Sequence, residues 1–210
     1  MNDILKKTFG WMFIGLLVTF ITAFVSSVNE NIAYSIYNMY LVLAIVEIGI
    51  VIFLSARITK MSPTTARIAF LLYSFVTGLT FASIFLYYEI SSIILVFLIT
   101  AIMFGVFAAV GYTTKLDLTK LGTYLLVGLI SIIICSIINI FIGGSAFVIV
   151  LSVLSIIVFL AYTAYDIQKI KYLEDYMDED NLAIFGALQL YLDFINIFID
   201  LLRIFGSRRD

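Results

Sequence analysis

Residues 182–205 read LAIFGALQLYLDFINIFIDLLRIF. The run is long enough to cross a bilayer, since a spanning helix needs about 20 apolar residues. Polar side chains interrupt it at spacings of 4, 3, 4 and 3 residues, namely Gln189, Asp193, Asn196, Asp200 and Arg203. In a helix this spacing places them on one face, over roughly 21 Å. Lipid cannot solvate such a face, so we expect it to point into a helix bundle or a watery path. A hydrogen-bond seam that only holds helices together is the alternative.

The composition of the whole chain agrees with a membrane protein. Of its 210 residues, 63% are hydrophobic and 12% are charged, whereas about a quarter of the residues of a soluble domain are charged. We therefore predict an all-α integral membrane protein, with residues 1–210 forming a single transmembrane domain in contact with membrane lipid. We expect a seven-transmembrane-helix bundle with the last helix central. The seven apolar runs are Phe9–Val28, Tyr37–Ser55, Ile68–Tyr88, Ser92–Tyr112, Leu121–Ile142, Ala146–Tyr165 and Leu182–Phe205.

Several function classes are excluded by residue counts. The chain has no histidine and a single cysteine, Cys135, so disulfide frameworks, zinc sites and Cys/His catalysis are ruled out. A net charge of −2 without an arginine-rich patch gives no indication of nucleic-acid binding. Any chemistry must therefore use carboxylates, hydroxyls and amides.

The lysines and arginines indicate the orientation in the membrane. A cytoplasmic amino terminus and acidic turn (residues 174–181) leave no basic residue in the three outer loops, which is a strong positive-inside signal. The carboxyl terminus is then outside, although it carries Arg203, Arg208 and Arg209. A last run that does not cross fully is the alternative. The nine basic residues on the inner side are Lys6, Lys7, Arg57, Lys60, Arg67, Lys115, Lys120, Lys169 and Lys171.

Two aspartates in the last two runs are equidistant from the acidic turn that joins them. The turn Asp178–Asn181 contains the midpoint between Asp166 and Asp193. If the sixth helix continues to this turn, both carboxyls lie at one level, roughly 20 Å from it. Two carboxyls in contact in a poorly solvated site cannot easily both ionise, so they share a proton. The spacing therefore predicts a pH-sensing pair. Alternatively each aspartate pairs with a basic residue, with Arg57 and Arg203 the nearest at span ends.

Three segments carry a resemblance to a known family. They are AYTAYDIQ (161–168), GALQLYLDFINIF (186–198) and LLRIFG (201–206). They are similar to the Bax inhibitor family, in its short bacterial form. The resemblance implies a seven-helix bundle with the last helix central, in a bacterial inner membrane, that acts as a pH-sensitive calcium leak channel.

The resemblance also implies roles for single residues. Asp166 and Asp193 match the family's di-aspartyl pH sensor, and Arg57 matches a basic residue that latches Asp166. Glu47 and Arg203 match a second ion pair near the pore. Calcium is then the permeant ion, held transiently by Asp166 and Asp193, with protons as the regulating ion and no resident cofactor. The polar stripe that lines the pore comprises Gln189, Asn196 and Asp200.

Other functions remain open at this stage. Tyr165-Asp166 is similar to one motif of intramembrane aspartyl proteases, but the second motif, Gly-x-Gly-Asp, is absent because Asp193 follows Leu190-Tyr191-Leu192. We therefore expect no enzymatic activity. A regulatory protein that binds a membrane protease or another membrane partner is the main alternative, and a proton-coupled transporter is a further one.

Overall fold

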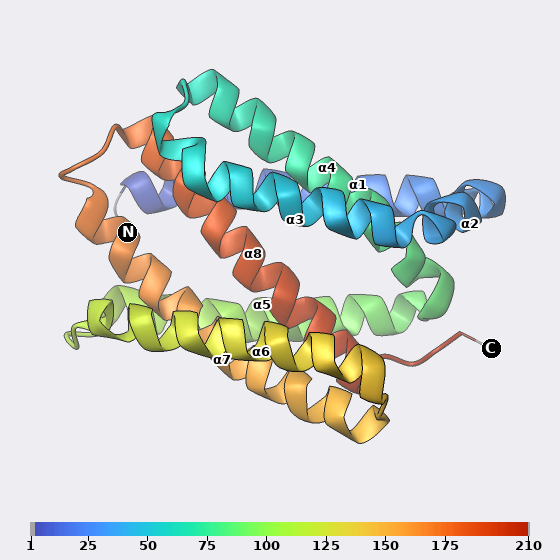
Figure 1. Cartoon of the computed structure of the whole chain (residues 1–210). Coiled ribbons are helices and arrows are strands. Elements are labelled where there is room, and N and C mark those ends of the chain that lie inside the picture. The colour runs from blue at the N-terminus through green and yellow to red at the C-terminus, as the bar shows by residue number, and fades with distance from the viewer. Residues whose placement is uncertain (1–2, 210) are drawn as a thin grey trace. The chain divides into compact units, whose positions relative to one another are not determined.

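A computed structural model describes residues 3–209, except the side chains of Glu30 and Thr59, and these residues are almost entirely helical (Figure 1). Within them, β pairing is limited to an isolated bridge between Tyr88 and Arg208. Two short 3-10 helices, η1 (Ile58–Lys60) and η2 (Leu118–Leu121), lie in the links. The α-helices are α1 (Asp3–Val28), α2 (Glu30–Asn38), α3 (Tyr40–Arg57), α4 (Pro63–Tyr87), α5 (Ile90–Thr113), α6 (Gly122–Ile142), α7 (Ser145–Leu173) and α8 (Glu179–Phe205).

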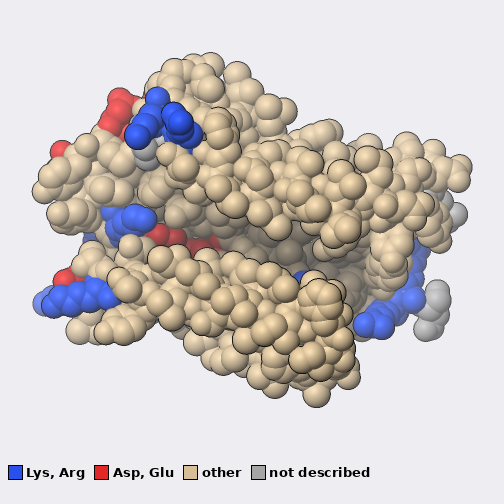
Figure 2. Space-filling model, in the orientation of Figure 1, with Lys and Arg blue, Asp and Glu red and all other residues tan. Residues whose placement is uncertain are grey.

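Seven of the described helices are long and apolar enough to cross a membrane, namely α1, α3, α4, α5, α6 with η2, α7 and α8. The face shown in Figure 2 is mostly tan, and the Lys and Arg atoms gather near helix ends. This pattern is typical of a protein whose helix sides face lipid. The prediction of an all-α, multi-pass membrane protein with seven spans is confirmed.

The short helix α2 lies where a simple link was expected. The Asn29 side chain begins it, since its Oδ1 accepts hydrogen bonds from the backbone N–H groups of Asn31 and Ile32 at 3.0 and 3.3 Å. An asparagine in this position satisfies amide groups that the first helical turn leaves unpaired. Asn29 is therefore the cap of an additional helix between the first two apolar runs.

Local sequence signals explain where the other helices begin and end. Ser62 Oγ accepts a hydrogen bond from Thr65 N at 3.2 Å, directly before Pro63 in the first turn of α4. Helix α6 ends at Gly143, whose φ of 67° favours glycine. Asp178 Oδ1 accepts from Asn181 N at 3.1 Å and begins α8. Helix α7 continues past its apolar run as far as Leu173, and residues 174–178, which are not helical, separate it from α8. The helix therefore stops short of the turn at Asp178–Asn181.

The chain divides into two compact units that share α8. Unit 1 comprises α1 to α4 with residues 173–191 and the end of the chain, and unit 2 comprises α5 to α7 with residues 192–207. The first half of α8 thus belongs to one unit and the second half to the other. Helix α8 is also the most deeply buried of the seven long helices, which confirms the expected central last helix. The single transmembrane domain stays a prediction.

In unit 1, α1 and α4 approach closely because glycines face side chains across the contact. A Cβ atom on Gly15 would lie 2.5 Å from the Phe70 ring, and one on Gly78 would lie 2.8 Å from the Thr19 carbonyl oxygen. Small residues commonly allow such approaches in membranes.

In unit 2, Gly111 allows α5 to approach α7 closely. A Cβ atom there would lie 2.7 Å from the Ala164 Cα atom, so the two backbones touch. The Phe194 ring of α8 packs edge to face against Phe97 and Phe104 of α5, with centroids 5.2 and 5.6 Å away. These contacts fix α5, α7 and the second half of α8 around Asp166 and Asp193.

Candidate functional site

The two aspartates singled out by spacing lie together in unit 2. Asp166 on α7 and Asp193 on α8 are 3% and 4% exposed, and they are close enough for their charges to interact. Among the described residues, Asp193 Oδ2 has no hydrogen-bond partner. A buried oxygen of this kind is costly unless it binds a proton, a water molecule or a cation. The role of the pair as a pH sensor stays a prediction.

Several side chains of α7, the helix that carries Asp166, lie near this pair of aspartates. Thr163 lies beside the Asp193 carboxylate, and Tyr162 lies within electrostatic range of both aspartates. One turn after Asp166, the Lys169 ammonium lies 5.5 Å from the centre of the Tyr165 ring. The pair therefore has hydroxyl groups and one cation near it on α7.

Two polar side chains hold the end of α7 in place beside this pair. Gln168 Oε1 accepts a hydrogen bond from Leu118 N at 2.7 Å, and its Nε2 donates to Leu116 O at 2.8 Å. Lys171 Nζ donates to the Tyr112 carbonyl oxygen at 3.0 Å and lies over that residue's ring. Gln168 and Lys171 thus tie α7 to η2 and α5 just beyond Asp166.

A second buried carboxylate lies further along α8. Asp200 Oδ1 accepts hydrogen bonds from Ser152 Oγ of α7 at 2.9 Å and from Arg203 Nη1 at 3.0 Å. Arg203 reaches this partner from one turn away on its own helix. Asp200 Oδ1 therefore has two donors, whereas Asp193 Oδ2 has none among the described residues.

The remaining two stripe residues are only half-buried. Asn196 Nδ2 donates to the Leu192 carbonyl oxygen at 2.7 Å, within α8. Gln189 lies two turns before it, in the part of α8 that belongs to unit 1. These two amides are therefore less deeply buried than Asp193 and Asp200, although all four share one face of the helix. Their part in lining a pore stays a prediction.

Unit 1 has a polar centre of its own around Glu47 of α3. The two carboxylate oxygens accept hydrogen bonds from Thr77 Oγ1 at 2.7 Å and Thr80 Oγ1 at 3.1 Å, both on α4. Close by, the fully buried Tyr191 hydroxyl lies 2.6 Å from Thr19 Oγ1 of α1. Glu47 is thus held by neutral hydroxyls of its own unit. Its pairing with Arg203, which belongs to unit 2, stays a prediction.

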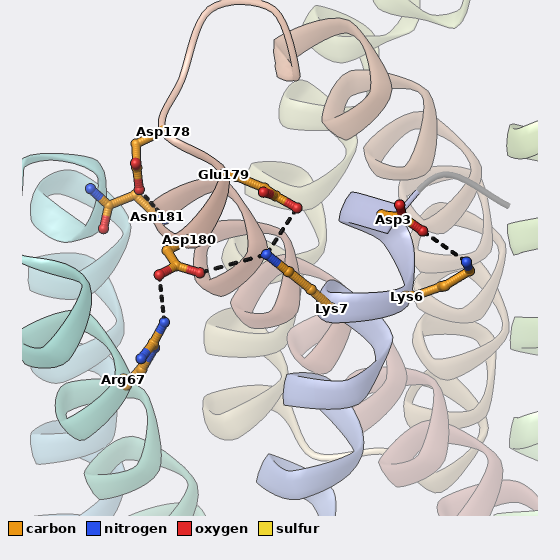
Figure 3. A network of polar contacts seen from close by, with 8 residues as sticks. All are labelled: Asp3, Lys6, Lys7, Arg67, Asp178, Glu179, Asp180 and Asn181. Carbon is orange, nitrogen blue, oxygen red and sulfur yellow. Dashed lines mark hydrogen bonds and ion pairs between the residues drawn. The ribbon is translucent and has the colours of Figure 1, made fainter.

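The acidic turn is held by two cations in unit 1, as Figure 3 shows. Lys7 Nζ of α1 lies 2.9 Å from Glu179 Oε1, and Arg67 Nη2 of α4 lies 2.8 Å from Asp180 Oδ2. Arg67 also lies over the Trp11 ring, 5.5 Å from its centre. Together these contacts hold the first turn of α8 against α1 and α4.

Arg57, the predicted latch, is the last residue of α3. It lines a shallow pocket with Phe53, Lys60 and Met61. Arg57 belongs to unit 1 and Asp166 to unit 2, so their latch stays a prediction.

Sequence reasoning missed most of the partners of these carboxylates. Thr77 and Thr80 follow a spacing of three on an apolar helix, which places them on one face and could have suggested an acceptor opposite them. Ser152 and Gln168 carry no such signal, because a single polar residue on an apolar helix does not indicate which neighbour it meets. The positive-inside argument places Lys7 and Arg67 on the same membrane side as the acidic turn, and that could have predicted their ion pairs.

The chemistry available at the paired aspartates is oxygen ligation and proton transfer. Among the described residues, no three acidic, cysteine or histidine side chains gather as a metal site would require. Calcium prefers six to eight oxygen ligands, so carboxylates at this pair would need water molecules to complete its shell. The arrangement is therefore suited to an ion in passage and to a proton that the pair shares.

Comparisons with known proteins identify relatives across the full length. The family described as "Inhibitor of apoptosis-promoting Bax1" matches residues 1–210. Inner membrane protein YbhL of Escherichia coli K12 is 41% identical over 214 residues, which cover 98% of this chain and 92% of YbhL. An uncharacterized protein of Borreliella burgdorferi is 40% identical over 217 residues, covering 100% of this chain and 94% of that protein. An uncharacterized protein of Deinococcus radiodurans is 32% identical, covering 97% and 90%.

Proposed function

The chain belongs to the Bax inhibitor family, and from that premise we propose that it is a pH-sensitive calcium leak channel in which Asp166 and Asp193 sense pH. The observation that carries the proposal is a pair of buried carboxylates on two packed helices, one of which has an oxygen without a partner among the described residues. Ionisable groups inside a membrane mark ion paths or proton relays by default. A pair that shares a proton responds to pH because its charge changes when that proton leaves.

The direction of gating follows from the charge of the pair. At acidic pH one shared proton joins the two carboxyls through a short hydrogen bond and draws α7 and α8 together. At alkaline pH the proton leaves, the two anions repel each other and attract a cation. Calcium flux is therefore expected to rise with pH.

The rest of the pathway uses the other intramembrane polar groups. Arg57 latches Asp166 in the closed state and opposes opening by compensating its charge. Glu47 and Arg203 form a second pair near the pore, which requires each to leave its present partners, Thr77 for Glu47 and Asp200 for Arg203. Calcium binds Asp166 and Asp193 only in passage. The polar stripe that lines the path comprises Gln189, Asn196 and Asp200.

The membrane is the bacterial inner membrane, with the amino terminus in the cytoplasm. The name of the E. coli relative, an inner membrane protein, and the distribution of basic residues support this assignment. Thiol labelling tests the orientation, with Ser207→Cys in a Cys135→Ser background. Labelling from the outside is expected, and labelling only from the cytoplasm would show that the last helix does not cross.

Ion flux into liposomes tests the activity. The purified chain is reconstituted with a calcium indicator inside the vesicles, and flux is followed from acidic to alkaline external pH. Calcium flux that rises with pH is expected, with Asp175→Asn as a matched control on an exposed aspartate. Equal flux in protein-free vesicles, or a sodium flux without calcium flux, would contradict the proposal.

A further inference from the structure

A small pocket at the end of α3 combines two cations with two apolar side chains. It has a volume of about 160 Å³ and is lined by Phe53, Arg57, Lys60 and Met61, all in unit 1. This volume is below that of sites for drug-sized ligands, roughly 300–1,000 Å³. The pocket is therefore suited to a compact charged group and not to a whole organic ligand.

The cations of this pocket differ from the others at the same end of unit 1. Lys7 and Arg67 are neutralised by Glu179 and Asp180 (Figure 3). Among the described residues, Arg57 and Lys60 form no ion pair. Figure 2 shows blue atoms gathered over the turn between α3 and α4. The pocket thus holds two cations that form no ion pair within residues 3–209.

The position of the pocket along the helix indicates the source of its ligand. Arg57 ends a membrane-spanning helix, and Lys60 ends the 3-10 turn that follows it. The ends of spanning helices lie at the level of lipid headgroups. Phe53, one turn before Arg57, is 57% exposed and lies where acyl chains begin. In a ligand with an anionic headgroup and an apolar tail, the headgroup matches the two basic side chains of the pocket and the tail matches the two apolar ones.

Phosphate matches the two cations chemically. The planar guanidinium of arginine donates two parallel hydrogen bonds to phosphate oxygens, and lysine adds a point charge. Basic residues at the cytoplasmic face commonly bind anionic headgroups. We propose that Lys60 and Arg57, when Arg57 is not latched to Asp166, bind the phosphodiester headgroup of an anionic membrane lipid, with Phe53 and Met61 against the start of its acyl chains.

Lipid titration of the full chain in detergent tests the proposal. Native mass spectrometry follows binding of dioctanoyl phosphatidylglycerol, with dioctanoyl phosphatidylcholine and inorganic phosphate as comparison ligands. Arg57→Gln with Lys60→Gln is expected to weaken phosphatidylglycerol binding about thirtyfold, since each basic residue near anionic lipid contributes about fivefold. Arg57→Lys with Lys60→Arg keeps both charges and is expected to retain most of the binding.

Matched controls separate a defined site from general attraction. Lys115→Gln with Lys120→Gln removes two exposed lysines elsewhere and is expected to leave the affinity within about twofold of the wild type. An equal loss in this control, or equal binding of phosphatidylcholine, would overturn the proposal. Displacement of the lipid by an equal concentration of inorganic phosphate would overturn the lipid assignment in favour of a free anion.

Discussion

Glu47 in unit 1 and Asp193 in unit 2 are both acidic residues within spanning helices, yet their surroundings differ. Glu47 has a hydroxyl donor for each carboxylate oxygen, from Thr77 and Thr80. Asp193 lies near a second carboxyl group, and its Oδ2 has no donor among the described residues. A carboxylate that neighbouring hydroxyls satisfy is stable without further ligands, whereas an unsatisfied one needs a proton, water or a cation.

The difference between Glu47 and Asp193 lies in their hydrogen-bond partners, and it separates a structural acidic residue from one proposed to respond to pH. Glu47 and Asp193 both interrupt apolar runs, so the sequence alone gives no reason to assign a functional role to one and not to the other. The hydrogen-bond partners distinguish them.

The largest effect is expected when the unsatisfied carboxylate loses its ability to titrate. Asp193→Asn keeps the shape of the side chain but cannot lose a proton, so calcium flux should become independent of pH. Glu47→Gln should keep a pH-dependent flux, because Glu47 is not part of the pair. Liposome flux across pH measures both variants. A wild-type pH curve in Asp193→Asn would remove the pair as the sensor.

The next effect concerns the close approach of α5 and α7 beside the aspartates. Gly111→Ala places a Cβ atom against the Ala164 backbone, so we expect a loss of about 3 kcal/mol in the free energy of unfolding. Gly105→Ala on the same helix meets no atom within 4 Å and serves as the control. Denaturant titration in mixed micelles compares the two. Equal stability would show that this contact is looser than the structure indicates.

A smaller loss is expected where a donor to Glu47 is removed. Thr77→Val leaves one carboxylate oxygen without its hydroxyl, at a cost of about 2 kcal/mol in the free energy of unfolding. Thr100→Val is the matched control, since that hydroxyl bonds only the Val96 carbonyl oxygen of its own helix. An equal loss in the free energy of unfolding in both variants would mean that the Thr77–Glu47 hydrogen bond adds no stability.

Arg57→Ala tests whether unit 1 acts on the pair at all. Without the cation, proton loss from the pair becomes less favourable, so the midpoint of the flux curve should move up by about one pH unit. The higher midpoint lowers flux at a single pH, whereas loss of the latch raises it, so a full titration is needed to separate the two effects. An unchanged midpoint would show that Arg57 and Asp166 do not interact.

The smallest effect is expected at the partly exposed ion pairs of the acidic turn. Arg67→Gln removes the partner of Asp180 and should lower the free energy of unfolding by about 0.5 kcal/mol at low salt. The difference should shrink at high salt because exposed charges are screened. Lys115→Gln, at an exposed lysine elsewhere, is the control. A large, salt-independent loss would show that the turn is a stronger anchor for α8 than its exposure implies.

The sequence alone predicted the features that depend on the length of the apolar runs and on the rise per residue of a helix. The seven spans follow from apolar runs, because about 20 apolar residues are needed to cross a bilayer. The equal level of Asp166 and Asp193 follows from an antiparallel turn with a fixed rise per residue. That argument required α7 to reach the turn at Asp178–Asn181, whereas α7 ends at Leu173, so its condition is met only in part.

Only the tertiary structure decided which helices meet and which polar groups satisfy one another. It showed that Thr77 and Thr80 hold Glu47, that Ser152 holds Asp200, and that Lys7 contacts the acidic turn. In a soluble protein an apolar stripe indicates the buried face of a helix. In a membrane both the lipid-facing and the protein-facing sides are apolar, so hydrophobic periodicity does not assign neighbours. Sequence therefore determined the spans, and packing determined the partners.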